Sequence, residues 1–163
     1  LGLVSGGSLV NGAFGNAGEI GHIPMPGNAA NLESVLSRLS LQRHLAEIGK
    51  VVDDIDTLES LFTNGDKDLH AWLKPASDAL SYAVSVVENL FDPETIIIGG
   101  AMPDALLEHF VNHTDLPTQS VANRPRAAHP RLQRGASGRM TATLGAAALV
   151  LNRTLSPHIA HAH

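Results

Sequence analysis

The residues best suited to chemistry lie in a glycine-rich stretch, residues 12–22. It reads Gly-Ala-Phe-Gly-Asn-Ala-Gly-Glu-Ile-Gly-His and places Glu19 three residues before His22. Glycines let the backbone approach a small ligand closely and adopt positive φ. A carboxylate beside an imidazole can clamp neighbouring hydroxyls of a sugar ring, and hydrogen bonds to charged groups contribute about 1.5–3 kcal/mol each. A glycine-rich turn with a buried, salt-bridged Glu19 accounts for the same residues without a ligand, so both interpretations stay open.

A hairpin must position the start of this stretch. Residues 1–4 and 8–11 are short strand-like runs, and Gly6 and Gly7 stand between them where a two-residue turn requires glycine. Residues 20–25 are a candidate third strand, whose two prolines would end it or place it at a sheet edge. Glu19 and His22 are therefore expected on a short, tightly turned segment that follows the hairpin.

Apolar residues at spacings of three and four predict the helices that follow. Asn31 and Asp56 are predicted N-caps, and Pro75 should kink or divide the longest helix. The buried stripe of that helix runs from Leu69 to Leu90. The predicted helices cover residues 31–49, 56–62, 66–91, 103–113 and 140–155.

Two further strands are predicted between and after these helices. Residues 95–98 are mainly β-branched and lead into Gly99 and Gly100, as in a buried parallel strand, and residues 131–133 form a weaker strand. Strands followed by alternating helices and strands indicate a layered α/β fold. The 163 residues fit one lobe, in which residues 156–163 are expected to be a flexible tail.

Composition excludes several classes of protein. Hydrophobic residues make up 44% and charged residues 17%, which argues against disorder, and the formal net charge of −5 disfavours nucleic-acid binding by this segment alone. No cysteine is present, so disulfides and thiolate metal sites are excluded. No apolar run is long enough for a membrane span, and no signal peptide is visible. We expect a cytoplasmic protein without membrane partners, and a first residue of Leu1 rather than Met suggests a fragment.

Five short motifs follow one another along almost the whole chain. They are residues 5–12 (Ser-Gly-Gly-Ser-Leu-Val-Asn-Gly), 17–22 (Ala-Gly-Glu-Ile-Gly-His), 31–37 (Asn-Leu-Glu-Ser-Val-Leu-Ser), 92–100 (Asp-Pro-Glu-Thr-Ile-Ile-Ile-Gly-Gly) and 144–147 (Leu-Gly-Ala-Ala). Their order and spacing resemble the ROK family of repressors and sugar kinases. The resemblance implies the actin-like ATPase (ribonuclease H-like) fold, of which this chain would be the C-terminal lobe only.

The resemblance also implies sugar-binding residues. In that family the Glu and His of the Glu-x-Gly-His motif and the Glu of the following segment bind sugar hydroxyls, which gives Glu19, His22 and Glu33 here. Without the resemblance, Glu33 would be an ordinary first-turn residue that the helix dipole favours. A hexose and an N-acetylhexosamine would use the same three contacts.

For the cofactor, the resemblance implies two glycine pairs. The family's diglycine lies against the adenosine of ATP, which indicates Gly99 and Gly100, and its hairpin approaches the phosphates, which indicates Gly6 and Gly7. Kinases of the family show Gly-Thr-Gly at the hairpin, whereas this chain has Leu3 in place of the hydroxyl, which weighs against phosphate binding there. ATP and Mg would be cofactors only of a complete kinase.

Two departures from the family pattern limit what this chain can do. Many members hold zinc with the motif His and three cysteines, but residues 23–31 contain none, so zinc through His22 is not expected. The family's Asp-x-Gly-x-Thr loop and the Asn-Asp pair that supplies the general base belong to an N-terminal lobe and do not occur here. No catalytic residue is therefore assigned, and this lobe alone cannot transfer phosphate.

Three hypotheses for function remain. The first is the sugar-binding lobe of an ATP-dependent sugar kinase, and the second is the effector-sensing lobe of a sugar-responsive regulator that contacts DNA through a helix-turn-helix upstream. The third is a non-catalytic interaction domain that keeps the motifs for folding. The resemblance also implies a homodimer formed through this lobe, with the helix over residues 66–91 as a candidate packing element.

Overall fold

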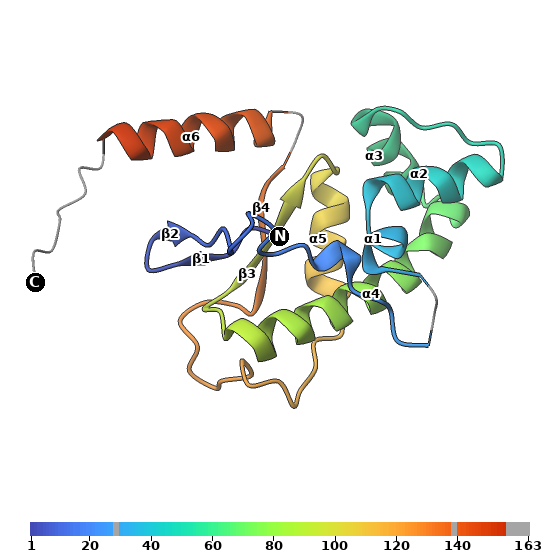
Figure 1. Cartoon of the computed structure of the whole chain (residues 1–163). Coiled ribbons are helices and arrows are strands. Elements are labelled where there is room, and N and C mark those ends of the chain that lie inside the picture. The colour runs from blue at the N-terminus through green and yellow to red at the C-terminus, as the bar shows by residue number, and fades with distance from the viewer. Residues whose placement is uncertain (28–29, 138–139, 156–163) are drawn as a thin grey trace, which may run out of the picture.

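The computed structural model describes residues 1–27, 30–137 and 140–155, and it is a mixed α/β structure built around one long helix (Figure 1). Its strands are β1 (Val4–Ser5), β2 (Ser8–Leu9), β3 (Ile96–Gly100) and β4 (Leu132–Ser137). Its helices are η1 (Ile20–His22), α1 (Leu32–Val35), α2 (Arg38–Glu47), α3 (Ile55–Thr63), α4 (Lys67–Phe91), α5 (Asp104–His113) and α6 (Thr141–Leu155).

The predicted hairpin is confirmed. β1 and β2 pair antiparallel with Val4 opposite Leu9, and the turn between them has φ of 57° at Gly6 and 76° at Gly7. Positive φ at both central residues is the geometry that matches the twist of a two-residue hairpin, and it is why glycine is needed there.

The strand predicted over residues 20–25 is wrong. The backbone instead turns into the single 3₁₀ turn η1, in which the amide of Ile23 donates to the carbonyl of Ile20 at 3.1 Å. Only Pro24 makes a bridge of the strand type, to Asn31. Gly18 at φ 89° reverses the chain just before η1, so the segment never becomes long enough to extend beside a neighbour.

The single helix predicted from Asn31 to Gly49 is divided into α1 and α2. Asn31 is the N-cap of α1, as predicted, and accepts from the Ser34 amide at 3.0 Å. A second cap interrupts the helix, because the Ser37 hydroxyl accepts from the Ser40 amide while the Ser40 hydroxyl accepts from the Ser37 amide. Such a reciprocal capping box begins a new helix even where the apolar spacing continues.

The N-cap of α3 was predicted two residues too late. Asp54, rather than Asp56, accepts from the Thr57 amide at 2.7 Å, and helix α3 begins at Ile55. A cap must lie outside the helix with extended backbone, and Asp54 meets this with φ −114° and ψ 163°.

Helix α4 is the central helix of the core. Asp66 caps it by accepting from the amides of Asp68 and Leu69, and Pro75 lies inside a helix that continues undivided to Phe91. The predicted buried stripe is confirmed except at its last member, since Leu90 is 69% exposed. The buried members are Leu69, Trp72, Leu73, Ala76, Leu80, Ala83, Val84 and Val87.

β3 and β4 pair in parallel, which confirms the two strands predicted here and adds that they are neighbours. Ile96 pairs with Leu132, and both side chains lie in the core with α4 and α5. The next residue along β3, Ile97, points to the opposite face and is 60% exposed, so one face of this two-stranded sheet is covered and the other is open. β3 ends at Gly99 and Gly100, and the carbonyl of Ala101 just beyond it accepts from Nη1 of Arg38 at 3.5 Å, which places the end of β3 beside the start of α2.

A buried ion pair fixes the segment that connects α5 to β4. Glu88 of α4 is 1% exposed and accepts from the Nε and Nη2 of Arg131, each at 2.7 Å, and from the Ser120 hydroxyl. Arg131 Nη2 also donates to the carbonyl of Pro117 at 2.9 Å. This network holds the start of β4 against α4.

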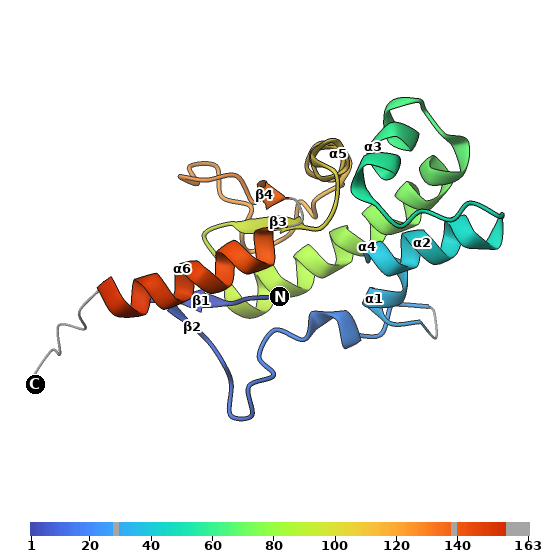
Figure 2. The ribbon, with the colours of Figure 1, turned by 90° about the horizontal axis from the view of Figure 1, so that it is seen from above.

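Helix α6 stands apart from α1–α5 in Figure 1, and Figure 2 shows it from above, where it is drawn over one end of α4. Leu144, Val150 and Leu151 on it are 57–66% exposed. The helix itself was predicted, and the tail predicted over residues 156–163 lies outside the described residues. None of the helices in the described part of the chain combines the length and apolar character that a membrane span requires.

Candidate sugar-binding site

The site begins with η1, which brings Glu19 and His22 together. The Nε2 atom of His22 lies 3.8 Å from Oε2 of Glu19, and the side chains are 70% and 65% exposed. The 3₁₀ turn causes this proximity, because residues three apart are eclipsed on such a helix. The buried, salt-bridged Glu19 considered as the alternative is not what the structure contains, since this carboxylate is open to solvent.

Gly18 and Gly21 let this turn pack closely. A Cβ at Gly18 would lie 2.2 Å from the carbonyl oxygen of Leu1, so only glycine fits where the first residue crosses the turn. A Cβ at Gly21 would lie 3.3 Å from Cβ and 3.4 Å from Oε2 of Glu33. The absent side chain of Gly21 is thus what allows Glu33 to lie against η1.

Glu33 reaches the site from the first turn of α1. Leu32 beside it is buried, and its amide donates to the carbonyl of Ile23 at 2.9 Å, which ties α1 to the end of η1. Asn31 fixes where the helix begins, so the direction of the Glu33 side chain follows from the cap. All three predicted sugar-binding residues are therefore brought to one region.

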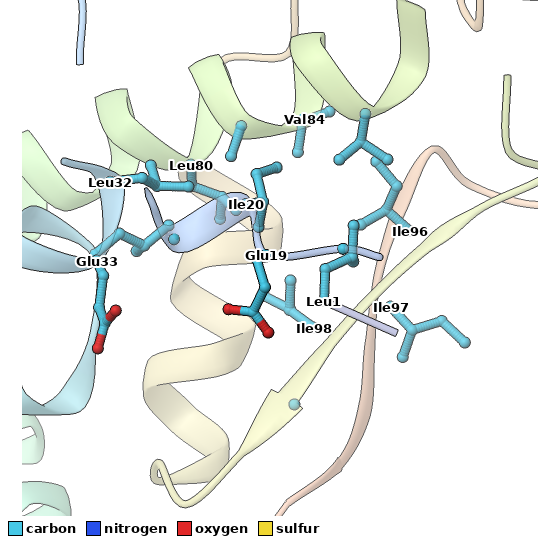
Figure 3. A pocket seen from close by; sticks show the side chains of 16 residues that line it. Leu1, Glu19, Ile20, Leu32, Glu33, Leu80, Val84, Ile96, Ile97 and Ile98 are labelled. Atoms are coloured by element: carbon cyan, nitrogen blue, oxygen red, sulfur yellow. The ribbon is translucent and has the colours of Figure 1, made fainter. Parts of the chain in front are cut away.

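A cavity of about 400 Å³ lies beside these groups (Figure 3). Glu19 and Glu33 both line it, and their carboxylates point toward the same open side, whereas His22 lies next to Glu19 outside the lining. The remaining walls are apolar, from η1, α1, α4 and β3. They include Ile20, Leu32, Leu36, Leu80, Val84 and Ile98.

A second cavity, of about 290 Å³, adjoins the first at Gly99 and lies at the carboxyl end of β3. Trp72 of α4 and Phe110 of α5 form part of its wall, with their rings edge to face at a centroid distance of 5.9 Å. Ligands of parallel α/β sheets bind at this end of the strands. Gly99 is therefore placed between a site with two carboxylates and a site with aromatic walls.

The two glycine pairs predicted for the cofactor do not share one position. Gly99 lines both cavities, and Gly100 adopts φ of 126° as the chain leaves β3. Gly6 and Gly7 lie at the exposed tip of the hairpin and line neither cavity. Of these four glycines, the structure thus places only Gly99 in the lining of the candidate site.

Met25 lies in the segment where the family resemblance implies a zinc site, and it makes contacts of another kind. The amide of Met25 donates to the carbonyl of Ala30 at 2.9 Å, and the Met25 side chain packs on Leu32, Ala79 and Ala83. No group of three or more His, Cys, Asp or Glu side chains among the described residues could hold a metal ion.

Sequence reasoning missed one polar residue of the second cavity, Arg38. It is the first residue of α2, and its Nη2 donates to the carbonyl of Asp53 at 2.6 Å while Nη1 reaches the carbonyl of Ala101 at 3.5 Å. Its Nε is buried without a partner in the described part of the chain. A single arginine between Ser37 and Leu39 carries no spacing signal, so only the fold reveals it.

Comparison with known proteins agrees with these observations. The model of the ROK family matches residues 1–153. Over 111 residues the chain is 32% identical to the "Bifunctional enzyme NanE/NanK" of Brucella melitensis, a match that covers 66% of this chain and 21% of that protein. Over 121 residues it is 26% identical to the "DNA-binding transcriptional dual regulator NagC" of Escherichia coli, covering 64% of this chain and 30% of that protein.

A solved structure shows the same fold. The ROK hexokinase from Thermus thermophilus superposes with a TM-score of 0.63 at 24% sequence identity, over 93% of this chain and 54% of that chain. This chain therefore has the actin-like ATPase fold and spans about half of the hexokinase and less than a third of the two curated relatives.

Proposed function

This chain belongs to the ROK family, and on that premise we propose that it is the C-terminal, sugar-binding lobe of an ATP-dependent sugar kinase. The observation that carries the proposal is the position of Glu19 and Glu33 on one side of one cavity, with His22 3.8 Å from Glu19. Similarity to a bifunctional enzyme NanE/NanK and to a ROK hexokinase supports a kinase.

The chemistry of the three side chains suits a sugar. Carboxylates accept hydrogen bonds from hydroxyls, and two of them with an imidazole can fix several adjacent hydroxyls of one ring. Because all three groups are exposed, a sugar that entered would displace water rather than protein contacts. A hexose or an N-acetylhexosamine is the proposed substrate class.

For the nucleotide, the proposal uses Gly99, Gly100 and the second cavity. Gly99 opens onto the cavity walled by Trp72 and Phe110, which suits the adenosine of ATP. The hairpin glycines Gly6 and Gly7 would face the phosphates only if the hairpin moved toward that cavity, and Leu3 offers no hydroxyl there. ATP and Mg²⁺ would supply the phosphoryl group and its charge neutralisation, while the general base would come from another lobe.

Similarity to the regulator NagC supports a second candidate, the effector-sensing lobe of a sugar-responsive transcriptional regulator. The same three side chains would then hold an effector sugar, and DNA would be bound by a domain outside these residues. In both proposals the protein works in the cytoplasm and pairs as a homodimer through this lobe.

A phosphoryl-transfer assay of the whole polypeptide separates the two candidates. ADP release from ATP and Mg²⁺ is measured with glucose and with N-acetylglucosamine, for the wild type and for Glu33→Gln. A kinase shows sugar-dependent ADP release that Glu33→Gln lowers by about ten- to a hundredfold in kcat/KM. Sugar binding without sugar-dependent ADP release would reject the kinase and leave the regulator.

A further inference from the structure

Arg38 is held in an incomplete set of contacts at the edge of the second cavity. A guanidinium has five N–H donors. Protein carbonyls accept from only two of its nitrogens, and the Ala101 contact, at 3.5 Å, is at the limit of a hydrogen bond. The buried Nε has no partner among the described residues, so the side chain is fixed by one strong bond, to the carbonyl of Asp53.

These contacts leave the Arg38 guanidinium unfavourable in free energy unless another group supplies the missing acceptors. A buried donor of a charged group that lacks an acceptor loses its hydration without replacement. At the start of α2 the neighbouring polar groups are paired, since Ser37 and Ser40 form a reciprocal capping box. Arg38, whose Nε lacks a partner among the described residues, is also the one residue of this helix that lines the cavity beside Gly99.

We propose that Arg38 determines the specificity of the second cavity for a purine nucleoside, by donating N–H groups in the plane of its guanidinium to acceptor atoms at the edge of the base. This inference rests on the proposed function and adds a residue to it. The Ala101 contact would be exchanged for the nucleoside, while the bond to Asp53 would keep the guanidinium in place.

The walls of the cavity favour this class of ligand. They are aromatic and aliphatic, they enclose about 290 Å³, and Arg38 is the only charged residue among those that line it. A flat base has apolar faces for such walls and acceptor atoms at its edge for the cation. A free phosphate would find one cation and no other charged partner, and a plain hydrocarbon would leave Arg38 as it is. The residues concerned are Ser37, Arg38, Trp72, Ile98, Met102 and Phe110.

The sole tryptophan of the chain reports on this cavity directly. Trp72 lines it, and its indole N–H donates to the Ser40 hydroxyl at 3.2 Å. The 163-residue chain is titrated with adenosine and, for comparison, with cytidine, and the NMR signal of the indole N–H is followed. Wild type is expected to respond to adenosine at a concentration several-fold lower than to cytidine.

Arg38→Gln is expected to weaken adenosine binding about tenfold and to remove the preference over cytidine, while the matched change Arg43→Gln on the same helix alters neither. Arg38→Lys keeps the charge without the planar fork and should lose the preference while remaining folded. An unchanged adenosine-to-cytidine ratio in Arg38→Gln and Arg38→Lys overturns the inference, as does a wild type that ignores adenosine. Glucose titration followed at the His22 ring then shows separately whether the sugar site stands.

Discussion

At the scale of single residues, the buried carboxylate of Glu88 has the largest predicted effect on stability. Burial raises its pKa, but hydrogen bonds from Arg131 and Ser120 together with the charge of Arg131 outweigh this and hold the pKa below 4.5. The folded state therefore binds the proton less readily than the unfolded state. The stability that this produces is complete above pH 4.5 and is lost as pH falls through the folded pKa.

Replacing Glu88 by Gln is expected to lower the free energy of unfolding by about 3–5 kcal/mol, because it leaves Arg131 without its counter-charge at a site where that side chain is 15% exposed. Urea unfolding followed by circular dichroism measures the change. Glu94→Gln is the control, since that exposed carboxylate only approaches His129 at the surface and should cost less than about 1 kcal/mol. Equal effects of the two variants would refute the role of the buried pair.

At the scale of elements, aromatic rings join α3, α4 and α5. His109 of α5 stacks on His113 at a centroid distance of 4.2 Å and meets the edge of Phe62 of α3 at 5.6 Å. Phe62 in turn stacks on His70 of α4. Burial first, and then the charges of His113 and His70, lower the pKa of His109 below 6.5.

This cluster predicts that the protein loses stability in mild acid. Because the unfolded chain takes up the proton first, the stability is complete above pH 6.5 and declines as pH falls toward the folded pKa. The melting temperature should fall between pH 7.5 and 5.5, by roughly 2–4 °C for each kcal/mol lost. His109→Gln should flatten this dependence and His44→Gln should not. If His109→Gln leaves the dependence of the melting temperature on pH unaltered, the acid sensitivity does not come from His109.

Where the two parallel strands pack together, a glycine of one strand lies against an isoleucine side chain of the other. A Cβ at Gly135 of β4 would lie 2.6 Å from Cγ2 of Ile97 in β3, closer than carbon atoms approach. Gly135→Ala is therefore expected to destabilise the protein by about 1–3 kcal/mol. Adding Ile97→Ala should recover most of that loss in a double-mutant cycle measured by urea unfolding. Strictly additive effects would mean that the contact does not govern the strand pairing.

At the scale of the whole molecule, the sequence predicted the parts that local chemistry determines. Two glycines at a hairpin turn, the apolar stripe of α4 and β-branched residues before a diglycine each specify one structure. The prediction was wrong where local chemistry allows two outcomes. Asp54 rather than Asp56 caps α3, and the capping box of Ser37 and Ser40 begins a new helix. Propensity favours both carboxylates equally, and only the backbone at the start of the helix decides.

The residues of the candidate site were also predicted only in part. Motif spacing pointed to Glu19, His22 and Glu33, because all three come from one continuous stretch whose order matches the family. Arg38 was missed because its importance depends on β3, which lies about sixty residues further along the chain. The exposure of Leu90 and Ile97 was missed for a related reason, since burial depends on which neighbours are present and not on the residue's own pattern.

Binding of a sugar by Glu19, His22 and Glu33 can be measured by isothermal titration of the chain with glucose and with N-acetylglucosamine. We expect Glu19→Gln to weaken binding of the preferred sugar by about ten- to a hundredfold, because a charged acceptor is lost. The control Glu59→Gln, at an exposed position, should bind as the wild type does. A Glu19→Gln variant with the affinity of the wild type would mean that this carboxylate does not bind the sugar, and it would favour a lobe whose motifs serve only folding.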